Sequence, residues 1–303
     1  MLPKFSRLLA VTAMSLMLPS AYAELTINHA LGTTTLPEPA VRIVTLYQGA
    51  TDAAIALGIE PVGAVESWVE KPIYQYLRGE LDYTTLVGLE TQPNLEAIAA
   101  LQPDVIIASE VRHAKVYDQL SQIAPTVAHE TVFMFDETLE LVAEVTGKAD
   151  AADAWLAQWQ ADADAFQADI AEQLQDDWPQ QVTMLNFRAD HARIYFQGFS
   201  GQVLADLGFE RPADHLKDTW GMKLTSKESI PSMNADVAFV FMEDDDAVQQ
   251  TYQQWTAHPL WQTLDAVQND AVYRVDQVAW NMAGGPLAAR QMLQDIRSHY
   301  GLD

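Results

Sequence analysis

The chain of 303 residues contains no cysteine. A disulfide framework is therefore impossible, and so is a lipid anchor on an N-terminal cysteine. Without these devices, the apolar content of 49% must supply the folding energy, and a chain of this length has ample room for real cores. We expect one large or two medium globular domains.

Long apolar runs are also missing. Residues 8–18 are mainly apolar, follow Lys4 and Arg7, and precede Ala21-Tyr22-Ala23, which has the A-x-A pattern of a cleavage site. This pattern predicts a signal peptide over residues 1–23, a mature chain beginning near Glu24, and export to the periplasm. The run is too short to span a membrane, and nothing later reaches the roughly 18 apolar residues that a spanning helix needs. We expect no membrane insertion.

Positive charge is scarce. The chain has 17 Lys and Arg against 42 Asp and Glu, which gives a formal net charge of −25. Cleavage after residue 23 would remove two positive charges and no negative ones. The negative electrostatic field of such a chain argues against nucleic acid and anionic membranes as partners. It also disfavours a strongly anionic ligand, unless local arginines offset the field.

Catalytic fingerprints are absent as well. No G-x-S-x-G elbow, Walker loop or G-x-G-x-x-G motif follows any expected strand, so we predict a binding protein rather than an enzyme. Gly284-Gly285-Pro286 begins a helix and could attract an anion, but its proline removes one donor. We predict an exposed turn there.

Direct metal ligation is a weak alternative. The seven histidines are scattered without metal-ligand spacing, and only His113 and His191 closely follow expected strands. The acidic run 243–246 lacks the glycine and the spacing of a calcium loop, so it predicts a solvated loop. We expect no cofactor and no metal held directly by the protein.

A repeated unit organises what is present. In PNLEAIAALQPDVIIAS (93–109) and in TSKESIPSMNADVAFVFM (225–242), a Glu precedes an Asp by eight residues, as Glu96–Asp104 and Glu228–Asp236. Apolar residues at helical spacing lie between them, and each Asp begins an apolar run that suits a buried parallel strand. Each half of the chain therefore has a helix-turn-strand unit of the same plan.

A second pair of similar units begins each half. Residues 42–47 predict a buried strand followed by a helix with Thr51 as N-cap, and residues 182–187 predict a strand followed by a helix with Ser200 as N-cap. Residues 25–36 predict a small edge ribbon. Further strands are expected at 61–65, 85–89, 105–108, 126–128, 237–242 and 272–275, with helices near 247–255 and 286–300.

The stretch between Gly147 and Pro179 contains neither Gly nor Pro, and Trp155, Trp159 and Phe166 fall near a helical period. A helix of about 28 residues would be about 42 Å long. We interpret it as a bridge between two lobes, although a bundle helix within one domain is the alternative. The predicted fold is α/β, with two Rossmann-like lobes of mainly parallel sheets (24–147 and 179–303) joined by one long α-helix (148–178).

Several motifs resemble one family. The repeat at 93–109, together with WQTLDAVQNDAVYRVD (261–276) and WNMAGGPLAARQMLQDI (280–296), resembles the periplasmic binding proteins of iron-siderophore and vitamin B12 ABC importers. Ser109 and the stretch RHAKVYDQLSQIAPTV (112–127) look closest to the ferric dicitrate and ferric hydroxamate branches. The resemblance covers nearly the whole mature chain, and it implies two lobes joined by one rigid helix, with the ligand held in the cleft between them.

The resemblance also implies a role for the repeat. In this family one glutamate on each lobe docks into arginine pockets of the inner-membrane ABC permease, and the matching positions are Glu96 and Glu228. The alternative is an acid at a helix start that the helix dipole favours, worth roughly 0.3–1 kcal/mol. Matched acids in both copies of the repeat favour docking.

Ligands of open α/β sheets collect beyond the carboxyl ends of the strands, so residues just after strands are the candidates. Aromatic side chains would wall a hydrophobic chelate, and arginines would donate to the oxygens that coordinate iron. Less favoured candidates are Phe199, Arg193 and Arg42. The predicted ligand-binding residues are Tyr47, Trp68, Arg112, Arg188, Tyr195, Trp220 and Trp280.

We expect a protein that captures a ferric siderophore and presents it to the permease. The acidic chain and its aromatic candidates favour a neutral or cationic ferric hydroxamate. Arg112 and Arg188 leave ferric citrate and mixed citrate-hydroxamate chelates open. Catecholates, heme and cobalamin rank lower. No oligomerisation element is apparent, so we expect a monomer.

Overall fold

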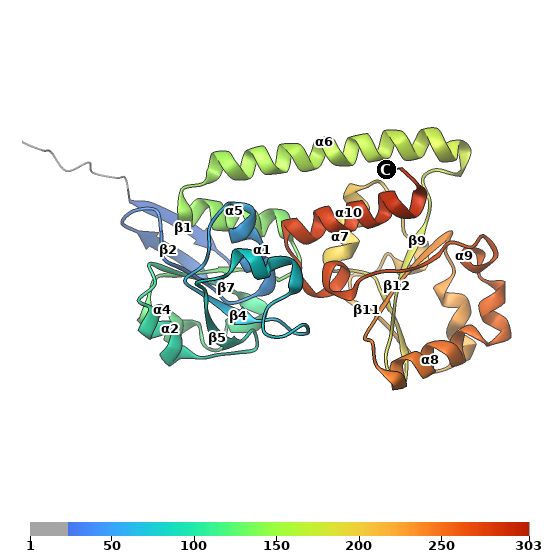
Figure 1. Ribbon diagram of the computed structural model, residues 1–303, viewed down its shortest axis with the longest axis horizontal. Coiled ribbons are helices and arrows are strands. Elements are labelled where there is room, and N and C mark those ends of the chain that lie inside the picture. Colours follow the sequence, from blue (N-terminus) through green and yellow to red (C-terminus); the bar gives the residue numbers. More distant parts are fainter. Residues whose placement is uncertain (1–23, 303) are drawn as a thin grey trace, which may run out of the picture.

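The computed structural model describes residues 24–302, so the predicted signal peptide lies outside the described residues. Two lobes, each built around its own sheet, lie side by side beneath the long helix α6 (Figure 1). The predicted two-lobe α/β fold and its bridging helix are confirmed. None of the helices within residues 24–302 combines the length and the hydropathy that crossing a membrane requires.

The N lobe contains a six-stranded sheet in the order β6-β5-β4-β3-β7-β8. Its strands run parallel except for the short β6, which pairs antiparallel to β5. The expected ribbon is the antiparallel hairpin β1–β2, which lies against β8. The strands are β1 Leu25–His29, β2 Gly32–Leu36, β3 Ile43–Thr45, β4 Gly63–Glu66, β5 Thr85–Leu89, β6 Gln92–Pro93, β7 Val105–Ser109 and β8 Thr126–His129. The helices are α1 Gln48–Ala56, η1 Gln75–Glu80, α2 Leu95–Leu101, α3 Glu110–His113, α4 Tyr117–Ile123 and α5 Phe135–Thr146.

The C lobe contains a five-stranded mixed sheet in the order β11-β10-β9-β12-β13. Strands β9, β12 and β13 run parallel, whereas β10 is antiparallel to both of its neighbours. The strands are β9 Val182–Phe187, β10 Ala192–Tyr195, β11 Gly221–Leu224, β12 Val237–Met242 and β13 Val272–Arg274. The helices are α7 Phe199–Asp206, η3 Ala213–His215, η4 Lys227–Met233, α8 Asp246–Thr256, η5 Pro259–Thr263, α9 Asp265–Gln268, the π-helical turn η6 Val278–Met282 and α10 Pro286–Tyr300.

Helix α6 (Ala149–Leu174) connects the lobes and is followed by the short η2 (Gln175–Asp177). Its buried stripe includes Trp155 and Trp159, which pack edge-on against Phe135 at the start of α5. The ring of Phe199 from α7 completes this cluster, with its centroid 6.1 Å from that of Phe135. One continuous apolar core therefore runs from the N lobe through α6 into the C lobe. Such a core limits relative motion of the lobes, because separating them would expose apolar surface.

The two aspartates of the sequence repeat have the same structural role. Oδ2 of Asp104 accepts hydrogen bonds from the backbone N–H groups of Val41 and Arg42, just before β3. Oδ2 of Asp236 accepts one from Gln181, just before β9. In each lobe the repeat thus anchors the chain where it enters the first strand of the parallel sheet.

Two predicted helix starts and one turn differ from the structure. Helix α1 begins at Gln48 rather than after Thr51, whose hydroxyl instead lies 2.8 Å from that of Thr45. Helix α7 begins at Phe199, with Gly198 rather than Ser200 as the N-cap. The predicted exposed turn 284–286 is wrong, because these residues are buried between the lobes.

Candidate ligand-binding site

A cavity of about 430 Å³ lies between the lobes, a size that suits a small-molecule ligand. Most of its lining follows parallel strands, as the strand-end rule predicts: Trp68 follows β4, Glu90 follows β5 and Arg188 follows β9. The lining residues are Gln48, Gly49, Trp68, Val69, Glu90, Arg112, Val132, Phe133, Arg188, Tyr195, Phe199, Glu243, Asn281, Met282, Ala283 and Gly284.

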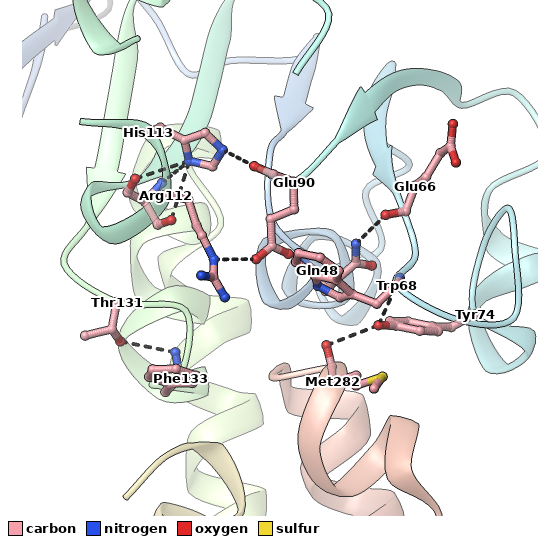
Figure 2. A network of polar contacts seen from close by, with 11 residues as sticks. Gln48, Glu66, Trp68, Tyr74, Glu90, Arg112, His113, Thr131, Phe133 and Met282 are labelled. Atoms are coloured by element: carbon pink, nitrogen blue, oxygen red, sulfur yellow. Dashed lines mark hydrogen bonds and ion pairs between the residues drawn. The ribbon is translucent and has the colours of Figure 1, made fainter. Parts of the chain in front are cut away.

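On the N-lobe side, a chain of hydrogen bonds positions Arg112 (Figure 2). The Nδ1 atom of His113 accepts from the backbone N–H of Ser109 at 3.0 Å, so its Nε2–H donates to the backbone oxygen of Glu90 at 2.9 Å. The side chain of Glu90 in turn accepts from Nε of Arg112 at 3.0 Å. The guanidinium is therefore fixed by a buried histidine and a buried carboxylate.

Burial shifts the pKa of both Glu90 and His113. Burial raises the pKa of Glu90, whereas the Arg112 charge and hydrogen bonds from Arg112, Gln48 and Trp68 lower it. Burial lowers the pKa of His113, so the ring is held neutral while it makes its two hydrogen bonds. The backbone N–H of Gln48 at the start of α1 also donates to Glu90, which places this carboxylate at a helix N-terminus.

On the C-lobe side, Arg188 has a comparable arrangement. Its Nε donates to Oδ1 of Asn186 at 2.8 Å, and its Nη1 pairs with Oε1 of Glu243. Asn186 is itself held because its amide donates to the backbone oxygen of Phe241. Each lobe therefore presents one arginine that a glutamate of the same lobe orients.

The charges of the lining side chains balance. The cavity has two arginines and two glutamates, so it is formally neutral within a chain of net charge −25. Within residues 24–302, both terminal amino groups of Arg112 and the Nη2 group of Arg188 have no protein hydrogen-bond partner. In Figure 2 the amino groups of Arg112 point away from Glu90, on the side of Phe133 and Met282. These donors are available to an oxygen-rich ligand.

Aromatic side chains form the walls around these donors. Trp68 is 42% exposed, and the guanidinium carbon of Arg112 lies 5.9 Å from its ring centroid. Phe133 is equally exposed, and Tyr195 and Phe199 line the C-lobe side. The structure thus brings together four of the predicted residues, namely Trp68, Arg112, Arg188 and Tyr195, and also the less favoured Phe199.

Three predicted residues lie elsewhere. Tyr47 and Trp280 are fully buried and do not line the cavity, because each has a partner inside the core. The hydroxyl of Tyr47 donates to Thr138, and the indole N–H of Trp280 donates to Asp295. Trp220 is half exposed outside the lining, but its ring packs edge-on against Tyr195 at 5.7 Å. It supports a cavity residue rather than forming the wall.

Sequence reasoning did not find Glu90 and Glu243. Both directly follow strands, so the strand-end rule would have identified them if it had been applied to acids as well as to aromatics and arginines. It also did not find Phe133, Asn281 and Met282. The acidic run 243–246 directly follows β12 and is exposed at residues 244–246, in agreement with the predicted solvated loop. Within this run Glu243 pairs with Arg188, and Asp245 caps α8.

The two predicted docking glutamates lie at matched positions. Glu96 is exposed in the first turn of α2, where Asn94 is the capping residue, and Glu228 is exposed in the first turn of η4, where Ser226 is the cap. Neither takes part in a salt bridge within the described chain. Both carboxylates are therefore accessible to a partner.

The described part of the chain contains no group of three or more His, Asp and Glu side chains placed to hold a metal ion. The two histidines that follow strands have other partners: His113 holds Glu90, and His191 bonds Asp190 and Arg193.

The chain is similar to known binding proteins over most of its length. The family model described as "Periplasmic binding protein" matches residues 43–279. The "Achromobactin-binding periplasmic protein" of Dickeya dadantii (strain 3937) is 42% identical over 264 residues, which cover 86% of this chain and 87% of that protein. The "Fe(3+) dicitrate-binding periplasmic protein FecB" of Escherichia coli (strain K12) is 32% identical over 275 residues, covering 89% and 88%.

Among solved structures, that of Staphylococcus aureus SirA complexed with staphyloferrin B is similar, with a TM-score of 0.88 and 46% identity. The match covers 91% of this chain and 98% of SirA.

Proposed function

Since this chain belongs to the periplasmic binding protein family, we propose that it captures a ferric siderophore between its lobes and delivers it to an ABC importer for iron uptake. The observation that carries the proposal is the cavity with one oriented arginine from each lobe and three amino groups open to a ligand. Iron is cargo in this mechanism, because the siderophore, rather than the protein, coordinates it.

The predicted signal peptide and the names of two relatives support a periplasmic location. Two relatives, at 42% and 32% identity, are named as periplasmic proteins. We propose that the mature chain acts in the periplasm. Membership of a family of binding proteins favours a non-enzymatic role, and the function needs no cofactor.

Two chelate classes suit the cavity. A ferric hydroxamate of neutral or cationic charge is our first prediction, because the lining is formally neutral and partly aromatic. A ferric citrate or mixed citrate-hydroxamate chelate is the second candidate. The open amino groups of Arg112 and Arg188 favour it, because guanidinium groups bind carboxylates in bidentate fashion, and one relative is named for ferric dicitrate.

In the proposed mechanism the arginines donate to oxygens that coordinate iron, while Trp68, Phe133 and Tyr195 contact the organic shell. The shared core limits closure of the lobes to a modest movement. Glu96 and Glu228 then dock onto the permease and orient the loaded protein there.

Titration of tryptophan fluorescence tests the proposal. The mature protein would be titrated with ferric hydroxamate, ferric citrate and ferric catecholate chelates, and with heme and cobalamin as outgroups. We expect saturable quenching by one iron chelate class and none by its iron-free ligand at the same concentration. An absence of quenching by every iron chelate would remove the proposed function.

A further inference from the structure

The buried turn at residues 284–286 is held by the opposite lobe. Helix α10 begins at Pro286, and its N-cap is Gly285, which has no side chain with which to cap the helix. Oδ1 of Asp52, from α1 in the N lobe, accepts from the backbone N–H of Leu287 at 2.7 Å, and its Oδ2 accepts from that of Ala288 at 3.2 Å. An aspartate of one lobe therefore caps a helix that packs on the other.

The far end of α10 belongs to the C lobe. His299 stacks on Tyr273 with ring centroids 4.5 Å apart, and Asp295 accepts from Trp280 in the C-lobe core. Near α6, the side chain of Arg297 pairs with Asp169 at 2.9 Å. Helix α10 thus lies alongside α6 as a second, non-covalent link between the lobes (Figure 1).

The two lobes approach each other so closely at the start of α10 that the glycines of this contact have no space for a side chain. A Cβ atom at Gly285 would lie 2.3 Å from Cβ of Asp52, and one at Gly49 would lie 2.5 Å from the backbone oxygen of Gly284. Two tyrosines of the N lobe, Tyr74 just before η1 and Tyr76 within it, add hydrogen bonds to this contact. The hydroxyl of Tyr76 donates to Asp52 at 2.6 Å, and that of Tyr74 donates to the backbone oxygen of Met282 at 3.3 Å.

The same segment forms part of the ligand cavity, because residues 281–284 line it. We propose that Asp52 is a positioning residue for this cavity: by capping α10 from the opposite lobe, it fixes the 281–284 wall and the relative orientation of the lobes. We call the Asp52 carboxylate and the two N–H groups it binds the interlobe latch. Its effect on ligand binding rests on the proposed function, whereas the latch itself does not.

A distance measurement tests the latch without ligand. Because the chain has no cysteine, cysteines introduced at the exposed Gln122 of α4 and Gln253 of α8 would carry the only two spin labels. We expect a narrow distribution of distances between the labels in the wild type and a broader one in Asp52→Asn. We also expect at least one of the amides of Leu287 and Ala288 to exchange with solvent about tenfold faster or more in the variant, because an asparagine side chain has a single acceptor oxygen where the carboxylate supplies one to each amide.

A double variant that moves the carboxylate onto α10 itself distinguishes capping of this helix from attachment of the two lobes to each other. In the double variant Asp52→Gly with Gly285→Asp, α10 has its own N-cap aspartate and the net charge is unchanged. The new side chain has space, because the change at position 52 removes the three atoms that would lie closest to a Cβ atom at position 285. We expect protection of the two amides to return while the distance distribution stays broad. Asp295→Asn is the matched control, because it alters a half-buried carboxylate of α10 whose partner Trp280 lies in the C lobe. It should leave the distribution narrow.

The latch is overturned if folded Asp52→Asn has the distance distribution of the wild type, or if the relocated carboxylate restores the narrow distribution. If the variants do not fold, hydrogen exchange of the wild-type protein tests the latch. We expect the backbone amides of Leu287 and Ala288 to be among its most slowly exchanging amides, and fast exchange of these two amides would overturn the latch. In a parallel titration with the chelate that the wild type binds, we expect about tenfold weaker binding by Asp52→Asn. If no chelate binds the wild type, the proposed function fails while the distance result stands.

Discussion

Arg112 donates from its Nε to Oε1 of Glu90 across 3.0 Å, and the side chain of Glu90 is only 4% exposed. This contact uses one edge of the guanidinium and leaves both terminal amino groups for the ligand. A lysine at position 112 would keep the charge but could not hold Glu90 and also present a planar pair of donors. We expect Arg112→Lys to weaken chelate binding by about tenfold, or about 1.4 kcal/mol, in a fluorescence titration.

The matched control is Arg193→Lys. Arg193 lies outside the cavity lining, where it donates to His191 and contacts the ring of Trp220. The same change of chemistry there should leave the dissociation constant unaltered. Equal losses in both variants would argue against a direct role for Arg112.

Trp68 should report ligand binding. It is one of eight tryptophans, but it is the one that lines the cavity, at 42% exposure. A ferric chelate that contacts its ring would quench its emission. We expect Trp68→Phe to remove most of the ligand-induced quenching, whereas Trp220→Phe, which alters a similarly exposed tryptophan (49%) outside the lining, should retain it. Quenching that survives in Trp68→Phe would place the chelate away from this wall.

The elements that depend on local pattern were predictable from the sequence. The strands 85–89 and 237–242 and the last helix 286–300 have the predicted bounds, and the bridging helix differs by a few residues at its ends. Apolar runs and helical periodicity identify these elements because the signal lies within each segment. The repeat also predicted that each lobe has an equivalent helix-strand unit.

Side-chain direction was much less predictable. Tyr47 and Trp68 both come after strands, yet Tyr47 points into the core because Thr138, distant in sequence, supplies a buried partner. The turn 284–286 was predicted to be exposed because the aspartate that buries it lies more than 200 residues earlier. Contacts of this kind depend on tertiary packing, which no local pattern encodes.

Charge reversal at the repeat tests the docking hypothesis. Glu96→Lys combined with Glu228→Lys should abolish iron uptake in cells while leaving chelate affinity unchanged, because both side chains are exposed and neither lines the cavity. Each single variant should reduce uptake in part. Binding of the purified protein to membranes containing the permease should weaken in parallel.

The control for this experiment is Asp150→Lys combined with Glu172→Lys. Both are exposed acids near opposite ends of α6, which lies across the molecule from α2 (Figure 1). The change in net charge is identical, so a loss of uptake in this control as well would indicate a general electrostatic effect rather than docking.

The burial of Asp52 should make stability depend on pH in a particular direction. Burial raises the pKa of its carboxyl from 3.8 to about 6, against hydrogen bonds from Tyr76, Leu287 and Ala288 that lower it. Between these values the folded chain binds a proton that the unfolded chain does not. The stabilising contribution of this group is therefore complete below pH 3.8 and is lost as the pH rises through 6.

Asp52→Asn lacks this titration, and subtraction of the variant removes the background from the other acidic residues. We expect the difference in free energy of unfolding, wild type minus Asp52→Asn, to fall by up to roughly 3 kcal/mol between about pH 4 and about pH 6, and to stay constant above about pH 7. Urea unfolding at a series of pH values measures it. A difference that rises with pH would mean that the three hydrogen bonds outweigh burial, because the carboxylate would then be the favoured form in the folded protein.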